Sequence, residues 1–166
     1  MEQLVVSGVT YNRNEAKVRL ADVKDTPGMA GKVFGPLSEA GIVVDMIVQN
    51  VSHDGSTDMT FTVPRADYAK ALEIAGGLRE DLGDIAVEGD DEIAKVSIVG
   101  LGMLDHAGVA AKMFRVLADE GINIQMIGTS EIKISVVIEE KYTELAVRAL
   151  HQAFVEDGAE GPRAEG

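Results

Sequence analysis

Two glycines occupy the same position in two similar segments and have the setting of an anion-binding turn. Gly28 and Gly108 each follow a predicted strand and open a predicted helix. The first turn of a helix offers backbone N–H groups without intrahelical partners at the positive end of its dipole. A residue without a side chain also lets a ligand approach the backbone. The pattern predicts carboxylate or phosphate binding; the alternative is an ordinary turn with Asp25 as the helix cap.

Polar residues near Gly28 extend this chemistry to an α-amino acid. Asp25 precedes the turn and supplies a carboxylate for an ammonium group. Gln49 and Asn50 end the next predicted strand, where an amide side chain can hydrogen-bond a ligand. Asn123 opens the equivalent strand of the second segment, where it is alternatively a turn residue after a glycine. A carboxylate receiver beside an ammonium receiver fits an α-amino acid.

The sequence lacks the residue patterns of common enzyme classes. The histidines His53, His106 and His151 are scattered, there is no cysteine, and no Ser/His/Asp order or HExxH spacing occurs. No Walker-type loop is found, and Gly100-Leu101-Gly102 lacks the third glycine of a dinucleotide fingerprint. Asp90-Asp91-Glu92 is a candidate cation site but is more typical of a solvated linker. We expect no catalytic residue, no metal and no cofactor in this chain.

Composition excludes further classes of partner. The 166 residues carry a formal net charge of -13, which repels nucleic acid and anionic lipid. Aromatic residues make up only 4%, too few for base-stacking platforms. No apolar run approaches the roughly 20 residues of a membrane span, and the N-terminus does not resemble a signal peptide. We expect a cytoplasmic protein that binds neither nucleic acid nor membrane.

An internal repeat divides the chain into two domain-sized units. Residues 25–47 align with residues 105–127 at an offset of 80, and ten of these 23 positions are identical. Upstream, Ala16-Lys17-Val18 matches Ala94-Lys95-Val96 at an offset of 78. A period near 80 residues is too long for a solenoid, so each repeat is expected to fold as a domain.

Hydrophobic periodicity predicts the same element order in both units. In the first unit we expect strands over Ala16–Val23, Ile42–Val51, Thr57–Val63 and Ile85–Glu88, and helices over Gly28–Ala40 and Arg65–Leu82. In the second we expect strands over Lys95–Val99, Asn123–Gly128 and Glu131–Ile138, and helices over Gly108–Glu120 and Glu140–Phe154. The order β-α-β-β-α-β is the ferredoxin-like pattern of an α+β fold. Pro36 is expected to kink or fray its helix.

The second unit lacks its fourth strand, while a spare strand precedes the first. Gln3–Val9 has the apolar pattern of a strand, and residues 156–166 are rich in glycine, proline and acids, which indicates a disordered tail. The economical solution is that the N-terminal strand completes the second sheet and the first unit is an insertion. The alternative is an ordinary edge strand of unit one, or a disordered end.

Several motifs resemble the tandem ACT domains of the C-terminal regulatory region of aspartate kinases. They are Lys95–Met103, His106–Val109, the run from Gly121 to Ile138 with Thr129–Ser135 at its centre, and Leu145–Phe154. Asp25–Gly28 and Val44–Asn50 are similar to the first ACT domain of that family. One departure lies at Met103–His106, where the family has a basic residue and then serine before histidine.

The resemblance implies two ferredoxin-like ACT domains, the first inserted into the second. We expect the first to cover residues 13–91 and the second to cover residues 1–12 plus 92–155. It also implies a regulatory module, not catalytic alone, whose partners are an amino-acid effector, a second copy in a homodimer, and the kinase catalytic domain or large subunit. The kinases phosphorylate the aspartate carboxylate with ATP, and feedback inhibition by threonine and/or lysine acts through such modules.

The resemblance further implies which residues bind the effector. The first pocket would use Asp25, Gly28, Met29, Ala30, Asp45 and Gln49, closed by Asn123 and Ile124 from a second-type unit. Its counterpart would use Val109, Ala110, Ser130 and Glu131. The alternatives are an ACT pair from another amino-acid-responsive protein, a dimerisation domain, and a ferredoxin-like hydrolase. The last needs a phosphate-binding arginine, and none lies between Asp25 and Gly28.

Overall fold

The computed structural model describes residues 6–100, 108–155 and 163–165, which divide between two compact units. The outer unit comprises residues 1–13 and 92–166, and the inserted unit comprises residues 14–91. The chain thus leaves the outer unit, forms the inserted unit, and returns. Both units have the ferredoxin-like order, so the expected α+β fold with one domain inserted into the other is confirmed.

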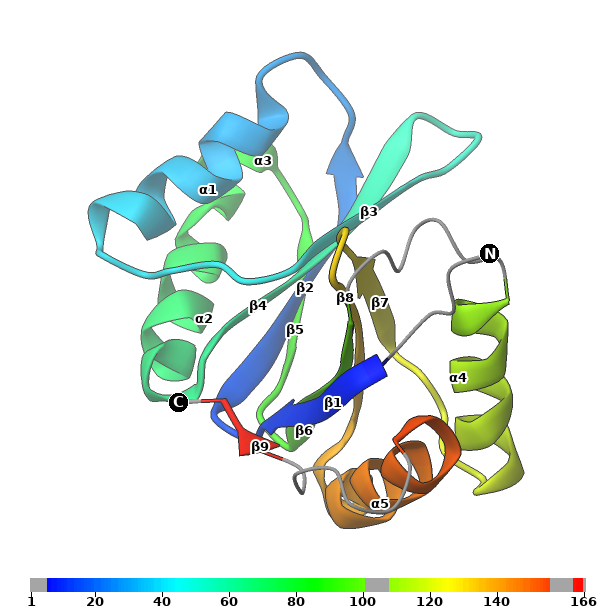
Figure 1. Ribbon diagram of the computed structural model, residues 1–166. Helices are drawn as coiled ribbons and strands as arrows, with labels where there is room; N and C mark the ends of the chain where they lie inside the picture. The colour runs from blue at the N-terminus through cyan, green and yellow to red at the C-terminus, as the bar shows by residue number, and fades with distance from the viewer. Residues whose placement is uncertain (1–5, 101–107, 156–162, 166) are drawn as a thin grey trace. The chain divides into compact units, whose positions relative to one another are not determined.

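The inserted unit is a four-stranded antiparallel sheet in the order β3-β4-β2-β5, with helices on one face (Figure 1). Its elements are β2 (Glu15–Lys24), α1 (Met29–Glu39), β3 (Ile47–Val51), β4 (Ser56–Pro64), a 3-10 turn (Arg65–Asp67), α2 (Tyr68–Gly77), α3 (Arg79–Leu82) and β5 (Ala86–Asp90). The single long helix expected over Arg65–Leu82 is therefore three short ones. Gly76 and Gly77 end α2, as expected from the low helix propensity of glycine.

The outer unit has a five-stranded sheet in the order β7-β8-β6-β1-β9. Its elements are β1 (Val6–Asn12), β6 (Ile93–Gly100), α4 (Val109–Asp119), β7 (Met126–Thr129), β8 (Lys133–Glu139), a 3-10 turn (Glu140–Tyr142), α5 (Thr143–Phe154) and β9 (Arg163–Ala164). β1 pairs antiparallel with β6, from Val6 opposite Gly100 to Asn12 opposite Lys95. The N-terminal strand thus stands where the second repeat lacks a strand of its own.

Each unit buries one face of its sheet under its two main helices. Alternating residues of β2 and β4, such as Leu20, Met59 and Phe61, are fully buried in the inserted unit. Helix residues that are 80 positions apart have the same role in the two cores. Leu37 of α1 is buried in the core of the inserted unit, and Leu117 of α4 is buried in the core of the outer unit. No helix in the described ranges is long and apolar enough to cross a membrane.

The second strand of each repeat begins later than expected, at Ile47 and at Met126, and in both repeats the residue after the glycine caps the preceding helix. Gly41 has a φ of 75°, and the N–H of Ile42 donates to the carbonyl of Leu37 at 3.0 Å. Ile122 makes the same 3.0 Å bond to Leu117 after Gly121, whose φ is 73°. A left-handed glycine followed by a buried apolar residue is the common helix-ending motif. The β-branched residues after each glycine therefore serve the cap before the strand begins.

Two further expectations differ from the structure. α1 runs through Pro36 to Glu39, and the N–H of Ala40 donates to the carbonyl of Pro36 at 3.1 Å, so the expected fraying is wrong. Burial of Leu37 and the glycine cap after it hold this last turn. The expectation of a disordered tail is wrong for Arg163–Ala164, which pair parallel to β1 as β9. Residues 156–162 and 166, also assigned to that tail, lie outside the described residues.

Candidate functional site

The N-terminus of α1 has the uncapped geometry that anion binding requires. Gly28 stands at the N-cap position with a φ of 87°, and no side chain caps the helix, so the alternative role of Asp25 as a cap is wrong. The N–H of Met29 donates to the carbonyl of Thr26 at 3.1 Å. The next N–H groups, of Ala30 and Gly31, are the ones without acceptors inside the helix. A carboxylate placed over this turn would meet two donors at the positive end of the helix.

Asp25 lies beside this turn and is held by the neighbouring hairpin. Its backbone N–H donates to the carbonyl of Gly55, in the β3–β4 turn, at 3.0 Å. The residue is exposed, so its carboxylate is accessible to a ligand. The hairpin thus brings an anionic side chain close to the amide donors of α1, which matches the two ends of an α-amino acid.

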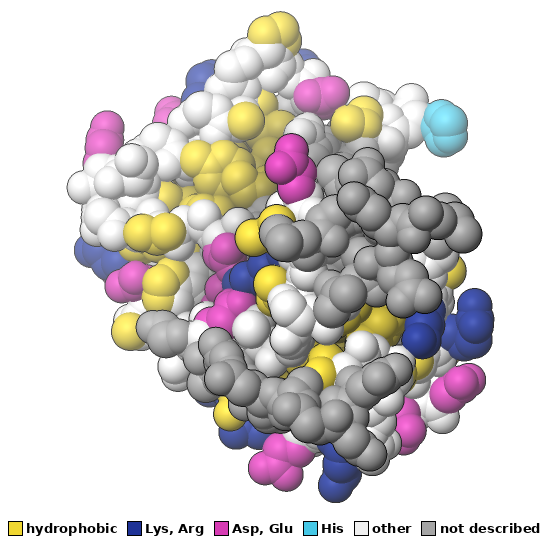
Figure 2. Space-filling view, viewed as in Figure 1, with side chains coloured by type: hydrophobic (Ala, Val, Ile, Leu, Met, Phe, Trp, Pro, Cys, Tyr) yellow, Lys and Arg dark blue, Asp and Glu magenta, His cyan; other side chains and the backbone are white. Residues whose placement is uncertain are grey.

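Gln49 projects from the edge strand β3 on the same side of the sheet as α1. It pairs with Met59, and residues directly opposite in an antiparallel pair share a face. Met59 belongs to the buried cluster that also contains Met29 and Val33 of α1. Two apolar neighbours on this side of β3, Ile47 and Val51, are 53% and 62% exposed. Figure 2 shows hydrophobic side chains gathered on the surface of the inserted unit between α1 and β3.

Asp45 stands at the far end of β3 from Asp25. The N–H of Asp45 donates to the carbonyl of Thr62 at 3.1 Å, while Asp25 bonds to Gly55. These two partners are seven residues apart in the chain containing β4, which corresponds to roughly 23 Å of extended strand. An α-amino acid is much shorter than this distance. The two carboxylates therefore cannot serve the ammonium group of the same bound ligand.

The equivalent turn of the outer unit repeats part of this geometry. Gly108 has a φ of 91° and precedes α4, which also lacks a side-chain cap. Val109 is buried, and Ala110 is half-buried against the core. Ser130 donates its N–H to the carbonyl of Lys133 at 2.8 Å in the β7–β8 turn, and Glu131 beside it is exposed. His106 and the rest of 101–107 lie outside the described residues.

Asn123 and Ile124 lie at the other end of β7 from this turn. They precede Met126, which pairs with Val137, whereas Ser130 follows Thr129, which pairs with Ile134. Asn123 is exposed and Ile124 is half-buried. The antiparallel register thus keeps these two residues away from Ser130 and Glu131, so they are available to a pocket other than the one after Gly108.

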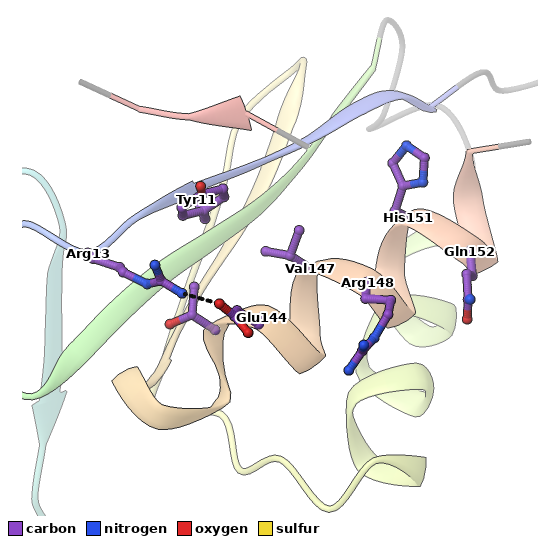
Figure 3. Close-up of a pocket in the computed structure, with 8 residues that line it drawn as sticks. Tyr11, Arg13, Glu144, Val147, Arg148, His151 and Gln152 are labelled. Atoms are coloured by element: carbon purple, nitrogen blue, oxygen red, sulfur yellow. Dashed lines mark ion pairs between the residues drawn. The ribbon is translucent and has the colours of Figure 1, made fainter. Parts of the chain in front are cut away.

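The structure also contains a cavity that sequence reasoning missed. It has a volume of about 420 Å³ and lies between β1 and α5; its lining residues are Tyr11, Arg13, Thr143, Glu144, Val147, Arg148, His151 and Gln152 (Figure 3). Nη2 of Arg13 lies 3.8 Å from Oε1 of Glu144. Arginine, histidine and glutamine side chains around an apolar floor suit a polar or anionic group. The α5 residues recur at helical spacing, but only the fold shows that β1 faces them.

None of the predicted effector residues lines this cavity, which separates it from the two glycine turns. Within the described part of the chain, no three His, Asp or Glu side chains are grouped as a metal site would need. The expected residues therefore offer backbone amide donors at the N-termini of α1 and α4, exposed carboxylates, and the amide side chains of Gln49 and Asn123.

Comparison with known proteins identifies the two repeats. Residues 18–79 and residues 96–154 each match the ACT domain family. The chain is 60% identical over 165 residues to an aspartate kinase of Stutzerimonas stutzeri, covering 99% of this chain and 40% of the relative. It is 62% identical over 154 residues to an aspartokinase of Pseudomonas aeruginosa, covering 93% of this chain and 37% of the relative. The chain thus spans about two fifths of these relatives.

Solved structures match the chain almost end to end. The regulatory subunit of aspartate kinase from Thermus thermophilus, in its ligand-free form, is 44% identical with a TM-score of 0.86; the match covers 90% of this chain and 99% of that subunit. A structure of aspartokinase alpha and beta subunits is 53% identical with a TM-score of 0.85, at the same coverages. The chain belongs to the aspartate kinase family, and it is the regulatory part, built from two ACT domains and not catalytic alone.

Proposed function

We propose that this regulatory module binds threonine at the N-terminus of α1 and so conveys feedback inhibition to an aspartate kinase. The observation that carries the proposal is the uncapped turn at Gly28 with Asp25 beside it. The ligand carboxylate accepts hydrogen bonds from the N–H groups of Ala30 and its neighbours. Asp25 receives the ammonium group, and Met29 forms part of the floor. Asp45, on the register given above, lies outside this site.

The side chain of the ligand is read by Gln49. Its amide both donates and accepts, so it pairs with the hydroxyl of threonine. Gln49 is exposed on an edge strand, where an arriving ligand can reach it. Lysine is the alternative effector, because a module with a net charge of -13 attracts its additional positive charge. The hydroxyl of threonine can donate a hydrogen bond to Gln49 and accept one from it, whereas the ammonium group of lysine can only donate. Affinity measurements on Gln49 variants therefore distinguish threonine from lysine as the effector.

The pocket is completed by a second copy of the chain. Ile47 and Val51 leave an apolar edge strand exposed, and such edges are usually covered by a partner. Asn123 and Ile124 of the second copy would cover the ligand bound at Gln49. The corresponding pocket of the outer unit would consist of Val109, Ala110, Ser130 and Glu131. A ligand that binds only the homodimer must stabilise the homodimer. In the whole cytoplasmic enzyme this equilibrium would act on the kinase domain that phosphorylates aspartate.

Isothermal titration calorimetry with threonine, lysine, methionine, isoleucine and leucine tests the assignment. Gln49→Ala should weaken threonine binding by about 1–3 kcal/mol, roughly 5- to 150-fold in Kd. Asp25→Asn should weaken every amino acid that binds, whereas Asp45→Asn is the matched control and should leave affinity unchanged. Sedimentation with and without threonine should show that ligand favours the dimer. The site would be refuted if threonine did not bind the wild type, or if it bound the Gln49 and Asp25 variants as tightly as the wild type.

A further inference from the structure

Three donors on the face of the outer sheet away from its helices converge on one carboxylate. Nζ of Lys133 lies 2.7 Å from Oε1 of Glu165, and Nζ of Lys95 lies 3.1 Å from Oε2. The hydroxyl of Thr10 donates to Oε1 at 2.7 Å. Both oxygens of the Glu165 carboxylate therefore accept charge-assisted or hydroxyl hydrogen bonds, the strong class of such interactions.

The strand register explains why two lysines can reach the same point. Thr10 pairs with Ser97, and Ser97 pairs with Ser135, so three small hydroxyl residues form one row across β1, β6 and β8. Lys95 lies two residues before Ser97, and Lys133 lies two residues before Ser135 on an antiparallel strand. The lysines therefore flank the row from opposite sides on the same face. The ammonium groups of both lysines reach the carboxylate of Glu165.

Burial distinguishes this contact from an ordinary surface ion pair. The side chain of Lys95 is 8% exposed, that of Glu165 is 23% exposed and that of Lys133 is 30% exposed. Exposed ion pairs contribute little to stability, but a lysine almost removed from water needs an anion close to its ammonium group. The site therefore favours a carboxylate over a neutral side chain.

The backbone of this segment contributes little without the side chain. β9 has two residues, Arg163 opposite Thr10 and Ala164 opposite Tyr11, and the N–H of Glu165 donates to the carbonyl of Tyr11 at 2.6 Å. A parallel pair this short is far below the usual strand length. The anchor that holds β9 against β1 is therefore the Glu165 carboxylate.

We propose that Lys95, Lys133 and Thr10 form a carboxylate-binding site whose ligand is the chain's own Glu165, and that this site controls whether the C-terminal segment closes the edge of β1. Because Glu165 belongs to the same chain as the site, its effective concentration there is on the order of mM, so a site of modest affinity is occupied. Release of Glu165 opens the β1 edge to another strand. The device is independent of the effector site proposed above.

Two variants test the site in the full chain. Glu165→Gln removes the charge from the ligand, and Lys133→Met removes one donor while leaving the C-terminal sequence intact. The readouts are the exchange rate of the Glu165 amide by NMR and the rate of trypsin cleavage after Arg163, corrected with free peptides of residues 156–166. Controls with the same charge changes are Glu120→Gln and Lys70→Met. Both of these side chains are exposed, and neither has a partner in the part of the chain that the structure describes.

The expected result is a protected Glu165 amide and slow cleavage in wild type and in both controls. Loss of protection and about tenfold faster cleavage are expected in Glu165→Gln and Lys133→Met, from the strength of hydrogen bonds to charged groups. An unprotected Glu165 amide in wild type, or unchanged behaviour of Lys133→Met, would overturn the proposal. Protection that falls on dilution would assign β9 to a second copy and would also overturn the intrachain site.

Discussion

Gly28 and Gly108, which are 80 residues apart, adopt the same left-handed conformation, with φ of 87° and 91°, at the N-cap positions of α1 and α4. A residue with a Cβ is strained there by about 1–2 kcal/mol. Alanine also lowers the conformational entropy of the unfolded chain, which stabilises the folded state by about 0.4–1 kcal/mol. Gly28→Ala should therefore lower the free energy of unfolding by about 1 kcal/mol in urea titrations.

Gly31→Ala is the matched control for this change. Gly31 lies inside α1, and an added Cβ meets no atom within 4 Å at either glycine, so neither substitution creates a clash. Alanine is favoured over glycine within a helix by roughly 0.5–1 kcal/mol, so this variant should be more stable than wild type. Equal effects at both positions would contradict the conformational explanation.

The repeat makes much of this fold predictable, because the same apolar spacing occurs twice. That spacing predicts that Leu37 and Leu117 lie on the apolar faces of helices, and both are buried. The strand boundaries are harder to predict from the sequence. Ile42 and Ile122 are residue types that favour strands, but they cap helices through backbone hydrogen bonds to Leu37 and Leu117. Propensity does not distinguish a β-branched residue in a strand from one that packs after a glycine cap.

The sequence predicts the residues at the turn before α1 better than the site residues that come from other elements. Gly28 and Asp25 are close in sequence, so the local pattern is sufficient to place them together. The family resemblance places Asp45 in the same pocket, and only the hydrogen bond from Asp45 to Thr62 shows that Asp45 lies at the other end of the strand. Composition predicts a disordered tail that includes Glu165, because no local pattern indicates partners that are distant in sequence.

Leu37→Ala and Leu117→Ala should each cost about 2–5 kcal/mol, the usual range for a buried leucine in a close-packed core. Both side chains are almost completely buried, at 1% and 0% exposure, in separate cores. Hydrogen exchange should therefore locate the damage: in β2 and β4 for the first variant, and in β6 and β8 for the second. Identical exchange patterns would show that the cores do not respond separately.

The hydroxyls of Ser97 and Ser135 form a buried hydrogen bond of 2.7 Å between β6 and β8. Alanine at either position leaves the other hydroxyl without this partner, which should cost about 1–3 kcal/mol. The double variant removes both polar groups, so it should cost clearly less than the sum of the two single changes. Urea unfolding of the wild type, the two single variants and the double variant measures this coupling. A double-variant cost equal to the sum of the two single costs would contradict it.

The carboxyl of Glu165 gives the C-terminal segment a defined response to acid. Burial raises its pKa, but hydrogen bonds from Lys133, Thr10 and Lys95 outweigh burial and hold the pKa at about 2, below the ordinary 4.5. A group with a lowered pKa stabilises the docked state fully above its ordinary pKa. That contribution should therefore be complete above pH 4.5, decline as the pH falls toward 2, and be absent below it.

NMR titration of the Glu165 side-chain carboxyl measures this directly. Wild type and the Glu120→Gln control should titrate with a midpoint near 2. Lys133→Met removes the largest of the favourable hydrogen bonds, so its midpoint should move upward toward 4.5. The sign is diagnostic, because burial alone would place the midpoint above 4.5, whereas an undocked carboxyl would titrate at 4.5 itself. A wild-type midpoint at or above 4.5 would show that the lysines do not hold the carboxylate in solution.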